Sequence, residues 1–268
     1  MKNLIMSMIL LSIVSSCKTD EKERRPESTV TTEIEVQEET IITPELRIKP
    51  IEHASLILEY GEHVIYVDPN GSEALYKGYK KPSLILITDI HGDHLSPETL
   101  DFIDTEGVKL VVPNAVKEKL PDPLKANSIV LNNGNTTELN GINIEAVPMY
   151  NLRPEALKFH EKGRGNGYIL TLGGERIYIS GDTEDIPEMR NLKGIDKAFI
   201  CMNLPYTMTV ESAASAVMDF EPKEVYPYHY RGTDGFSNVE KFKMLVNSAT
   251  DNVKVIQLDW YPNKDDVK

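Results

Sequence analysis

The sequence predicts an α/β protein in which two β-sheets lie between layers of helices, an αββα sandwich in one domain. Three observations lead to this prediction. From about Leu46 onward, strand-like and helix-like stretches alternate along the chain. Two pairs of strand-like stretches are joined by short turns that are typical of hairpins. The uninterrupted apolar run at 84–87 is typical of a strand that is covered on both faces.

Local signals predict the individual elements. Two apolar runs around Gly61-Glu62 predict a hairpin over 55–69, and Gly173-Gly174 predicts the turn of a second one over 167–182. A Ser cap followed by Pro at the first helical position predicts a helix over 96–104. The other expected elements are strands at 83–88, 108–113, 197–203, 223–230 and 252–260, strands joined by Asn/Gly turns within 127–148, and helices over 209–220 and 237–249.

The N-terminus is interpreted as a targeting segment outside the fold. Residues 1–16 hold one Lys and an apolar stretch too short to span a bilayer comfortably, which predicts a signal peptide. The ending Val14-Ser15-Ser16-Cys17 resembles a bacterial lipoprotein processing site, where Cys17 would carry the lipid. The alternative is an ordinary signal peptide that happens to contain a cysteine. The lipoprotein interpretation predicts a lipid-anchored protein of the bacterial cell envelope, on the periplasmic side or at the outer-membrane surface.

The cysteine that is predicted to be lipidated is followed by a segment that predicts a flexible tether. The cysteine and the tether together span 17–45. The segment is charged, rich in Thr and Glu, and nearly devoid of large apolar side chains, so burial cannot offset the entropy of ordering it. The folded domain is expected over 46–262, with a C-terminal tail at 263–268. Cys201 would then be the only remaining cysteine, and its apolar surroundings in the sequence predict a small core residue without a disulfide.

The formal net charge of −13 argues against binding to nucleic acid, because a phosphate backbone requires a basic surface. The charge does not exclude an anionic ligand that is held by a local cationic site, such as a metal ion. The expected partners are therefore a small-molecule substrate, which can be anionic, and a membrane contacted through the N-terminal lipid. The sequence does not indicate an oligomeric state.

The clearest chemical signal directly follows the apolar run at 84–87. Asp89, His91 and Asp93 alternate, so they would share one face of an extended segment, and His94 could turn in beside them. Imidazoles and carboxylates are common ligands of zinc, manganese and iron. The alternative is a polar loop after a buried strand, but two histidines within four residues, next to two aspartates, are unusual in a chain with only six histidines. The cluster therefore predicts a metal site.

Further residues turn this cluster into a resemblance to a known family. The additional stretches, in order, are His53-Ala54-Ser55, Asp68-Pro69, His160, Asp182 and His229. Their order resembles the metallo-β-lactamase superfamily, in which a strand-end H-x-H-x-D-H motif precedes a His, an Asp and a final His. The chain is more closely similar to the branch of metal-dependent hydrolases around L-ascorbate-6-phosphate lactonase, and more distantly to N-acyl-phosphatidylethanolamine phospholipase D. The resemblance covers about 46–262 and is specific for the superfamily rather than for a substrate.

The resemblance implies the metallo-β-lactamase fold and two divalent ions, zinc or manganese, with iron as a further alternative. The implied ligands are His91 and His160 for the first ion, Asp93, His94 and His229 for the second, and Asp182 as the bridge. Asp89 stands where the family has its first histidine. If Asp89 is a ligand, its hard oxygen and negative charge would favour manganese or iron. If Asp89 points away, the first site would be weak or empty.

Other residues are expected to support the site. By the resemblance, Asp68 would accept a hydrogen bond from a ligand imidazole, whereas by itself it is a turn residue. His53 would either contact the ligands or the substrate, or be a histidine at a strand edge. Candidates for hydrogen bonds to substrate are Asn203, Tyr206 and Tyr228, although buried tyrosines more often serve packing. Candidates for binding a negative charge, or simply for solvation of a loop, are Arg153, Lys162 and Arg164.

These expectations lead to a metal-dependent hydrolase. A metal-bound hydroxide would attack an ester, lactone or phosphodiester, with Asp93 and Asp182 as catalytic residues and Asp93 also orienting the water. A first alternative is a phospholipid-directed phosphodiesterase at the membrane, which the tether favours, although the sequence shows no large apolar stripe for lipid entry. A second alternative is a non-catalytic lipoprotein that binds metal or solute. The intact set of Asp93, His94, Asp182 and His229 argues against that loss of catalysis.

Overall fold

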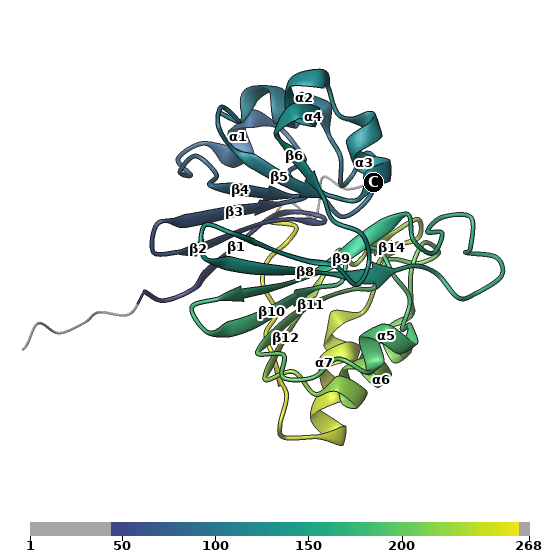
Figure 1. The fold of residues 1–268 in the computed structure, drawn as a ribbon. Helices are drawn as coiled ribbons and strands as arrows, with labels where there is room; N and C mark the ends of the chain where they lie inside the picture. Colours follow the sequence, from purple (N-terminus) through teal and green to yellow (C-terminus); the bar gives the residue numbers. More distant parts are fainter. Residues whose placement is uncertain (1–43, 263–268) are drawn as a thin grey trace, which may run out of the picture. The chain divides into compact units, whose positions relative to one another are not determined.

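Two β-sheets pack face to face, and helices cover their outer faces (Figure 1). The computed structural model describes residues 44–262. The predicted signal peptide, Cys17, all but the last two residues of the predicted tether and the tail at 263–268 lie outside the described residues. None of the described helices is long and apolar enough to cross a membrane.

The first sheet has six strands in the order β1-β2-β3-β4-β5-β6. Its first three strands pair antiparallel, and the pairs from β3 to β6 are parallel. The strands are β1 (Arg47–Glu52), β2 (Ser55–Tyr60), β3 (His63–Val67), β4 (Leu84–Leu86), β5 (Lys109–Val112) and β6 (Ser128–Val130). Its outer face is covered by α1 (Glu73–Tyr76), α2 (Pro97–Phe102), α3 (Asn114–Lys119) and α4 (Asp122–Asn127) (Figure 1).

The second sheet has seven strands in the order β15-β12-β11-β10-β9-β8-β7. They are β7 (Thr136–Leu139), β8 (Ile142–Met149), β9 (Gly165–Leu172), β10 (Glu175–Ile179), β11 (Lys197–Cys201), β12 (Glu224–Tyr228) and β15 (Lys254–Val255). Its outer face carries α5 (Pro187–Arg190), α6 (Val210–Phe220) and α7 (Val239–Ala249) (Figure 1). A small hairpin of β13 (Arg231–Gly232) and β14 (Gly235–Phe236) follows β12.

The apolar run before the metal-binding motif belongs to two hydrophobic cores at once. Leu84 and Leu86 point into the core between the sheets, whereas Ile85 and Ile87 point into the core under the first layer of helices. Side chains alternate along a strand, so a strand that is covered on both faces needs an uninterrupted apolar sequence. The predicted αββα sandwich in one domain is therefore confirmed, and β4 is its central, fully buried strand.

Most of the predicted elements are present. Tyr60 pairs with His63 across the first hairpin turn, and α2 begins at Pro97, with the Ser96 side chain accepting the backbone N–H of Thr99 at 3.2 Å. The closing strand predicted over 252–260 is wrong in length, because only Lys254–Val255 pairs with β12. The chain then leaves the sheet, and Trp260 is buried against aromatic side chains of the core.

Candidate metal centre

The predicted ligands gather at one end of the molecule, where β4, β10 and β12 end. Asp89 to His94 follow β4, Asp182 follows β10, and His229 follows β12. His160 lies in the loop between β8 and β9, and His53 lies in the turn between β1 and β2. The carboxyl ends of parallel strands meet at one edge of a sheet, which is why such loops form binding sites in α/β proteins. Both sheets contribute to this site.

Three groups of side chains each have their ligand atoms within 4.8 Å of one another, and two of the groups share His229. We name them the Asp89 cluster (Asp89, His91, His160), the Asp182 cluster (His94, Asp182, His229) and the Asp93 cluster (His53, Asp93, His229). All seven predicted ligands fall into these groups, together with His53. All predicted ligands are thus neighbours in space, although the chain separates the first from the last by 140 positions (229 − 89).

Asp182 lies between the Asp89 cluster and the rest of the site. Its Oδ2 is 3.2 Å from His160 Nε2 and 3.4 Å from His94 Nε2, and its Oδ1 is 3.0 Å from His229 Nε2. Burial alone would raise the pKa of Asp182, but the charges of His229 and His94 lower it well below its usual value. An ionised carboxylate between two groups of imidazoles has the position that a bridging ligand requires.

Several of the inward-facing atoms have no hydrogen-bond partner among residues 44–262. These atoms are His94 Nε2, His160 Nε2 and Asp182 Oδ1, which lie close together but not in hydrogen-bonding geometry. A buried polar atom without a partner costs free energy, so native structures rarely leave one unpaired. Ligation of a metal ion would satisfy all three atoms. Because nitrogen and carboxylate oxygen suit zinc, manganese and iron, the donor set fits a divalent metal.

A buried carboxylate fixes the orientation of His94. Asp68 Oδ2 is 2.8 Å from His94 Nδ1, and Asp68 itself accepts the backbone N–H of Thr88 at 2.7 Å and the Thr88 hydroxyl at 2.6 Å. These contacts direct His94 Nε2 toward Asp182, as carboxylates behind metal-ligating histidines do. Burial alone would lower the pKa of His94, but the carboxylates of Asp182, Asp93 and Asp68 raise it well above its usual value. A metal ion would therefore have to displace a proton from His94.

The His53 side chain holds the carboxylate of Asp93 in place. Asp93 Oδ2 is 3.2 Å from His53 Nε2, and His53 Nδ1 is 2.7 Å from the Tyr261 hydroxyl. Burial, followed by the charge of His229, lowers the pKa of His53 to about 4, so its ring is neutral near pH 7. Because a carboxylate can only accept, we assign the proton to Nε2, which donates to Asp93, while Nδ1 accepts from Tyr261.

The unusual residue of the motif, Asp89, faces the site. Its Oδ2 is 2.6 Å from His91 Nδ1 and 3.9 Å from His160 Nε2. Arg164 also donates to both carboxylate oxygens, from Nε at 3.2 Å and from Nη2 at 3.1 Å. Burial alone would raise the pKa of Asp89, but the His91 hydrogen bond and the nearby positive charges lower it to about 2. Of the two expectations for Asp89, the geometry favours the one in which it can serve as a ligand.

Three site residues adopt backbone angles that are uncommon for residues other than glycine. His53, Asp68 and His229 have φ values of 57°, 44° and 45°. Such conformations cost free energy and persist only where the surrounding structure enforces them. In each case the side chain contacts another member of the site. Glycine, the strongest sequence signal for such conformations, is absent from all three positions, although Asp and His adopt them more often than most other residues do.

A cavity of about 450 Å³ opens onto the clusters. Of the predicted substrate contacts, Asn203 and Tyr206 line it, and Asn203 Nδ2 is 3.2 Å from His229 Nε2. The expectation for Tyr228 is wrong as a substrate contact. Its side chain is fully buried in the core, with its ring centroid 5.6 Å from that of Trp260, because β12 directs it away from the cavity.

The three candidate cations near His160 are paired with carboxylates. Arg153 contacts Glu184 at 2.6 Å, Lys162 contacts Glu188 at 2.9 Å, and Arg164 contacts Asp89 at 3.1 Å. The cation that does line the cavity is Arg231. Sequence reasoning missed Arg231, and also Thr88, Phe159, Thr233 and Tyr261. Arg231 could have been found from its place directly after the final Tyr228-His229-Tyr230 motif, whereas the others carry no local signal.

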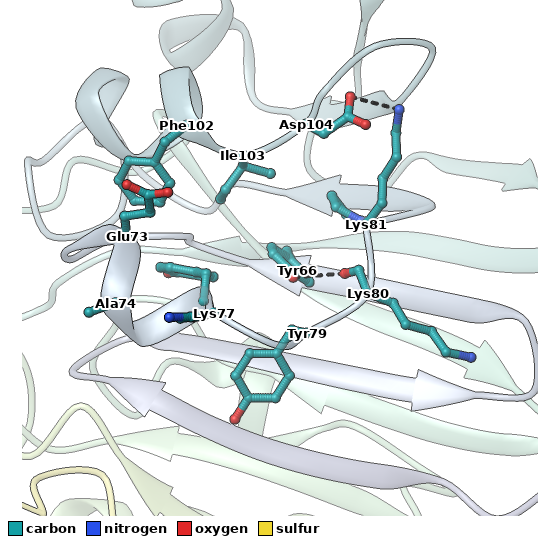
Figure 2. Close-up of a pocket in the computed structure, with 12 residues that line it drawn as sticks. Tyr66, Glu73, Ala74, Lys77, Tyr79, Lys80, Lys81, Phe102, Ile103 and Asp104 are labelled. Carbon is teal, nitrogen blue, oxygen red and sulfur yellow. Dashed lines mark hydrogen bonds and ion pairs between the residues drawn. The ribbon is translucent and has the colours of Figure 1, made fainter.

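A second cavity, of about 540 Å³, lies on the outer side of the first sheet beside α1 (Figure 2). Two hydrogen bonds join polar groups of its lining. Lys81 donates to Asp104 at 2.7 Å, and the Tyr66 hydroxyl donates to the Lys80 carbonyl at 2.9 Å (Figure 2). None of the metal-binding clusters touches this cavity. The His/Asp groups therefore distinguish the cavity at the strand ends from this one.

Two sheets between helices, with overlapping His/Asp clusters at the strand ends, define a protein of the metallo-β-lactamase superfamily. Residues 47–229 match the family model described as "Beta-lactamase superfamily domain". The match covers more than half of the chain, so the chain belongs to this family. The resemblance found in the sequence is confirmed.

Individual relatives agree with this assignment. A UPF0173 metal-dependent hydrolase from Pyrococcus abyssi is 31% identical over 223 residues, which cover 80% of this chain and 96% of that protein. The crystal structure of a protein from Parabacteroides distasonis, described as a metal-dependent hydrolase, is similar with a TM-score of 0.74 and 42% identity, over 81% of this chain and 94% of that one. A metallo hydrolase from Ignicoccus hospitalis, with a TM-score of 0.67, 24% identity and coverage of 80% and 94%, shows the same fold.

Proposed function

We propose that this protein is a hydrolase that uses two divalent metal ions to cleave an ester, a lactone or a phosphodiester. One observation carries the proposal. His160 and Asp182, whose buried ligand atoms are unpaired, line an open cavity, and the unpaired Nε2 of His94 lies 3.4 Å from Asp182 Oδ2. The names of the relatives, several of which are metal-dependent hydrolases, support the same reaction class. They do not specify a substrate.

In this proposal Asp182 bridges two sites. The Asp89 cluster would hold one ion, and Asp93, His94 and His229 would hold the other. Bound there, divalent ions would lower the pKa of a water molecule and polarise the bond to be cleaved. Zinc, manganese and iron all suit these donors. Because Arg164 shares the carboxylate of Asp89, we expect the ion at the Asp89 cluster to be held more weakly than the other.

The residues around the ligands would orient the reacting groups. The neutral His53 ring holds Asp93, whose side chain is the most exposed of the site carboxylates, in place to accept a proton from the attacking water. Asn203 Oδ1 accepts the Thr207 hydroxyl at 2.5 Å, which leaves the amide Nδ2 beside His229 Nε2 as the donor of this cavity-lining residue. Arg231 supplies a positive charge that can bind an anionic part of the substrate.

The proposed location rests on the sequence alone. A signal peptide at 1–16 and a lipid on Cys17 would anchor the domain to a membrane of the bacterial cell envelope. A non-catalytic metal-binding or solute-binding lipoprotein is disfavoured by the complete ligand set and by the positioned Asp93. The phospholipid-directed alternative requires an apolar surface beside the cavity on which lipid chains can bind.

Metal analysis and an activity panel would test the proposed function. The purified protein is expected to contain divalent metal by mass spectrometry and to hydrolyse at least one of an aryl ester, a lactone and bis(p-nitrophenyl) phosphate. Asp182→Asn is expected to lose metal and at least 100-fold in kcat/KM, about 2.7 kcal/mol of transition-state stabilisation. Asp234→Asn, on an exposed loop near the site, is the matched control and should retain both. Full metal content and activity in Asp182→Asn would show that the proposal is wrong.

A further inference from the structure

Exposed apolar side chains are concentrated around the metal cavity. Of the six large apolar side chains that are exposed among residues 44–262, five lie on the loops that border this cavity. These five, which we call the apolar rim, are 36–48% exposed: Leu152, Leu157, Leu204, Tyr206 and Phe236. Scattered exposed apolar residues are normal, but a group beside a binding site indicates a binding surface.

The loops of the apolar rim are bonded to one another. The loop between β8 and β9 contacts the loop after β11 through Asn151, whose Nδ2 donates to the Tyr206 carbonyl at 2.7 Å. The Phe159 and Tyr206 rings are 5.1 Å apart between centroids. The loop after β11 is joined in turn to the β13–β14 hairpin, because the backbone N–H of Thr233 donates to the Leu204 carbonyl at 3.1 Å. Three segments that are distant in the sequence therefore form one connected border.

The apolar rim is continuous with the cavity. Tyr206 belongs to both, and Phe159, from the same loop as Leu157, lines the cavity beside His160. Thr233, which donates its hydroxyl to the Tyr206 hydroxyl at 2.9 Å, lines the cavity beside Arg231. A ligand that fills the cavity thus meets imidazoles, carboxylates, a guanidinium and the aromatic rings of Phe159 and Tyr206. The leucines of the apolar rim lie on the two loops that carry these rings.

We propose that the substrate is an amphiphilic small molecule with an acyl or alkyl tail. Its hydrolysable head occupies the metal cavity, and its tail lies on the apolar rim. The proposal rests on the proposed function for the identity of the head group, but tail binding can be measured without turnover. Each buried methylene contributes up to about fourfold in affinity. Because the rim is an open surface rather than a closed tunnel, we expect about twofold per methylene along the part of the tail that it covers.

The experiment measures binding of a homologous ligand series to the metal-loaded full chain. Cys17→Ser is used throughout, so that no attached lipid competes for the apolar rim. Calorimetry with ethyl-, butyl-, hexyl- and octylphosphonate, all below their micelle concentrations, is expected to show at least a 20-fold gain in affinity from ethyl to octyl. Leu157→Ser and Leu204→Ser should each reduce that gain at least threefold and leave ethylphosphonate binding unchanged. Met244→Ser, at the exposed apolar residue on α7, is the matched control and should change neither.

Each other outcome overturns the proposal. Equal affinities along the series would show that no tail binds, whether or not the protein is a hydrolase. Binding to phosphatidylglycerol vesicles that is lost in the rim variants, without any preference among soluble phosphonates, would make the rim a membrane contact instead. Sedimentation that shows a dimer in Cys17→Ser and a monomer in the rim variants would make it a subunit interface. Turnover of p-nitrophenyl acetate, measured in parallel, tests the hydrolase separately from the tail.

Discussion

Replacing Arg164 by methionine removes both N–H groups that hold the buried carboxylate of Asp89. Asp89 is fully buried, and the remaining partner is His91 Nδ1 at 2.6 Å. Breaking a buried ion pair costs about 3–5 kcal/mol, because the charge that remains is poorly solvated. The Arg164 side chain is 17% exposed, so water can replace part of the lost contact. We therefore expect Arg164→Met to lower the free energy of unfolding of the metal-free protein by about 3 kcal/mol, at the low end of that range.

Urea unfolding of the metal-free protein, followed by circular dichroism at pH 7, measures this loss. Lys241→Met is the control, since the ion pair of Lys241 with Glu211 is exposed, with side-chain exposures of 44% and 56%. Exposed pairs contribute about 0–1 kcal/mol, so the control should remain within that range. The double variant Asp89→Asn, Arg164→Met removes the uncompensated charge, and it should recover at least half of the stability that Arg164→Met loses.

Metal binding gives the second measurement. Without the guanidinium, the carboxylate of Asp89 is free to serve an ion together with His91 and His160. We expect manganese to bind at least tenfold more tightly to the weaker of two sites in Arg164→Met, as measured by calorimetry. If Arg164→Met were as stable as the wild type and bound metal identically, the pairing of Arg164 with Asp89 would not be the interaction that controls this site.

Three further predictions concern single residues. Asp89→His replaces a hard oxygen by an imidazole, so the ratio of zinc to manganese affinity should rise at least tenfold by competition calorimetry, and an unchanged ratio would mean that Asp89 is not a ligand. Burial raises the pKa of Cys201 from 9.0 to about 12. The folded chain therefore binds one more proton than the unfolded chain between these values, and the free energy of unfolding falls as pH rises from 9 toward 12. Between pH 8 and 10, the free energy of unfolding of Cys201→Ala, measured with urea, should fall by about 1.4 kcal/mol less than that of the wild type. Equal decreases would refute the raised pKa of Cys201. Ser96→Ala removes the cap of α2 and should cost about 1 kcal/mol in the same assay, whereas no loss would show that the bond to Thr99 contributes nothing.

Local signals predicted the parts of the fold that depend on neighbouring residues. The hairpin at Gly61-Glu62 and the cap at Ser96 were predicted because a turn or a helix start is encoded within a few positions. The helices α1, α3, α4 and α5 were missed. Each has four to six residues, which is too short for the 3.6-residue period of a helix to be recognised.

The site was predictable to the extent that its ligands follow strands. Asp89, His91, Asp93 and His94 stand in one motif, and the family resemblance predicted the other candidate ligands, which lie beside this motif in the fold. Arg164 opposite Asp89 was not predictable as a pair, because 75 positions separate the two residues (164 − 89). The apolar rim could not be predicted from the sequence for the same reason. Its members come from three loops that meet only in the folded chain, so the sequence shows no continuous apolar stripe.

Both sheets contribute ligands, and this has a consequence for when a metal ion can be captured. Every cluster contains a residue from position 160 or beyond, and the Asp182 and Asp93 clusters both require His229. A growing chain that ends before His160 has none of the three groups complete, even though the whole H-x-D-H part of the motif is already present. A complete set of the predicted ligands would therefore form only when the second sheet docks on the first. Once bound, an ion would cross-link the two sheets and close loops of more than 60 residues. This cross-link would slow the separation of the two sheets during unfolding.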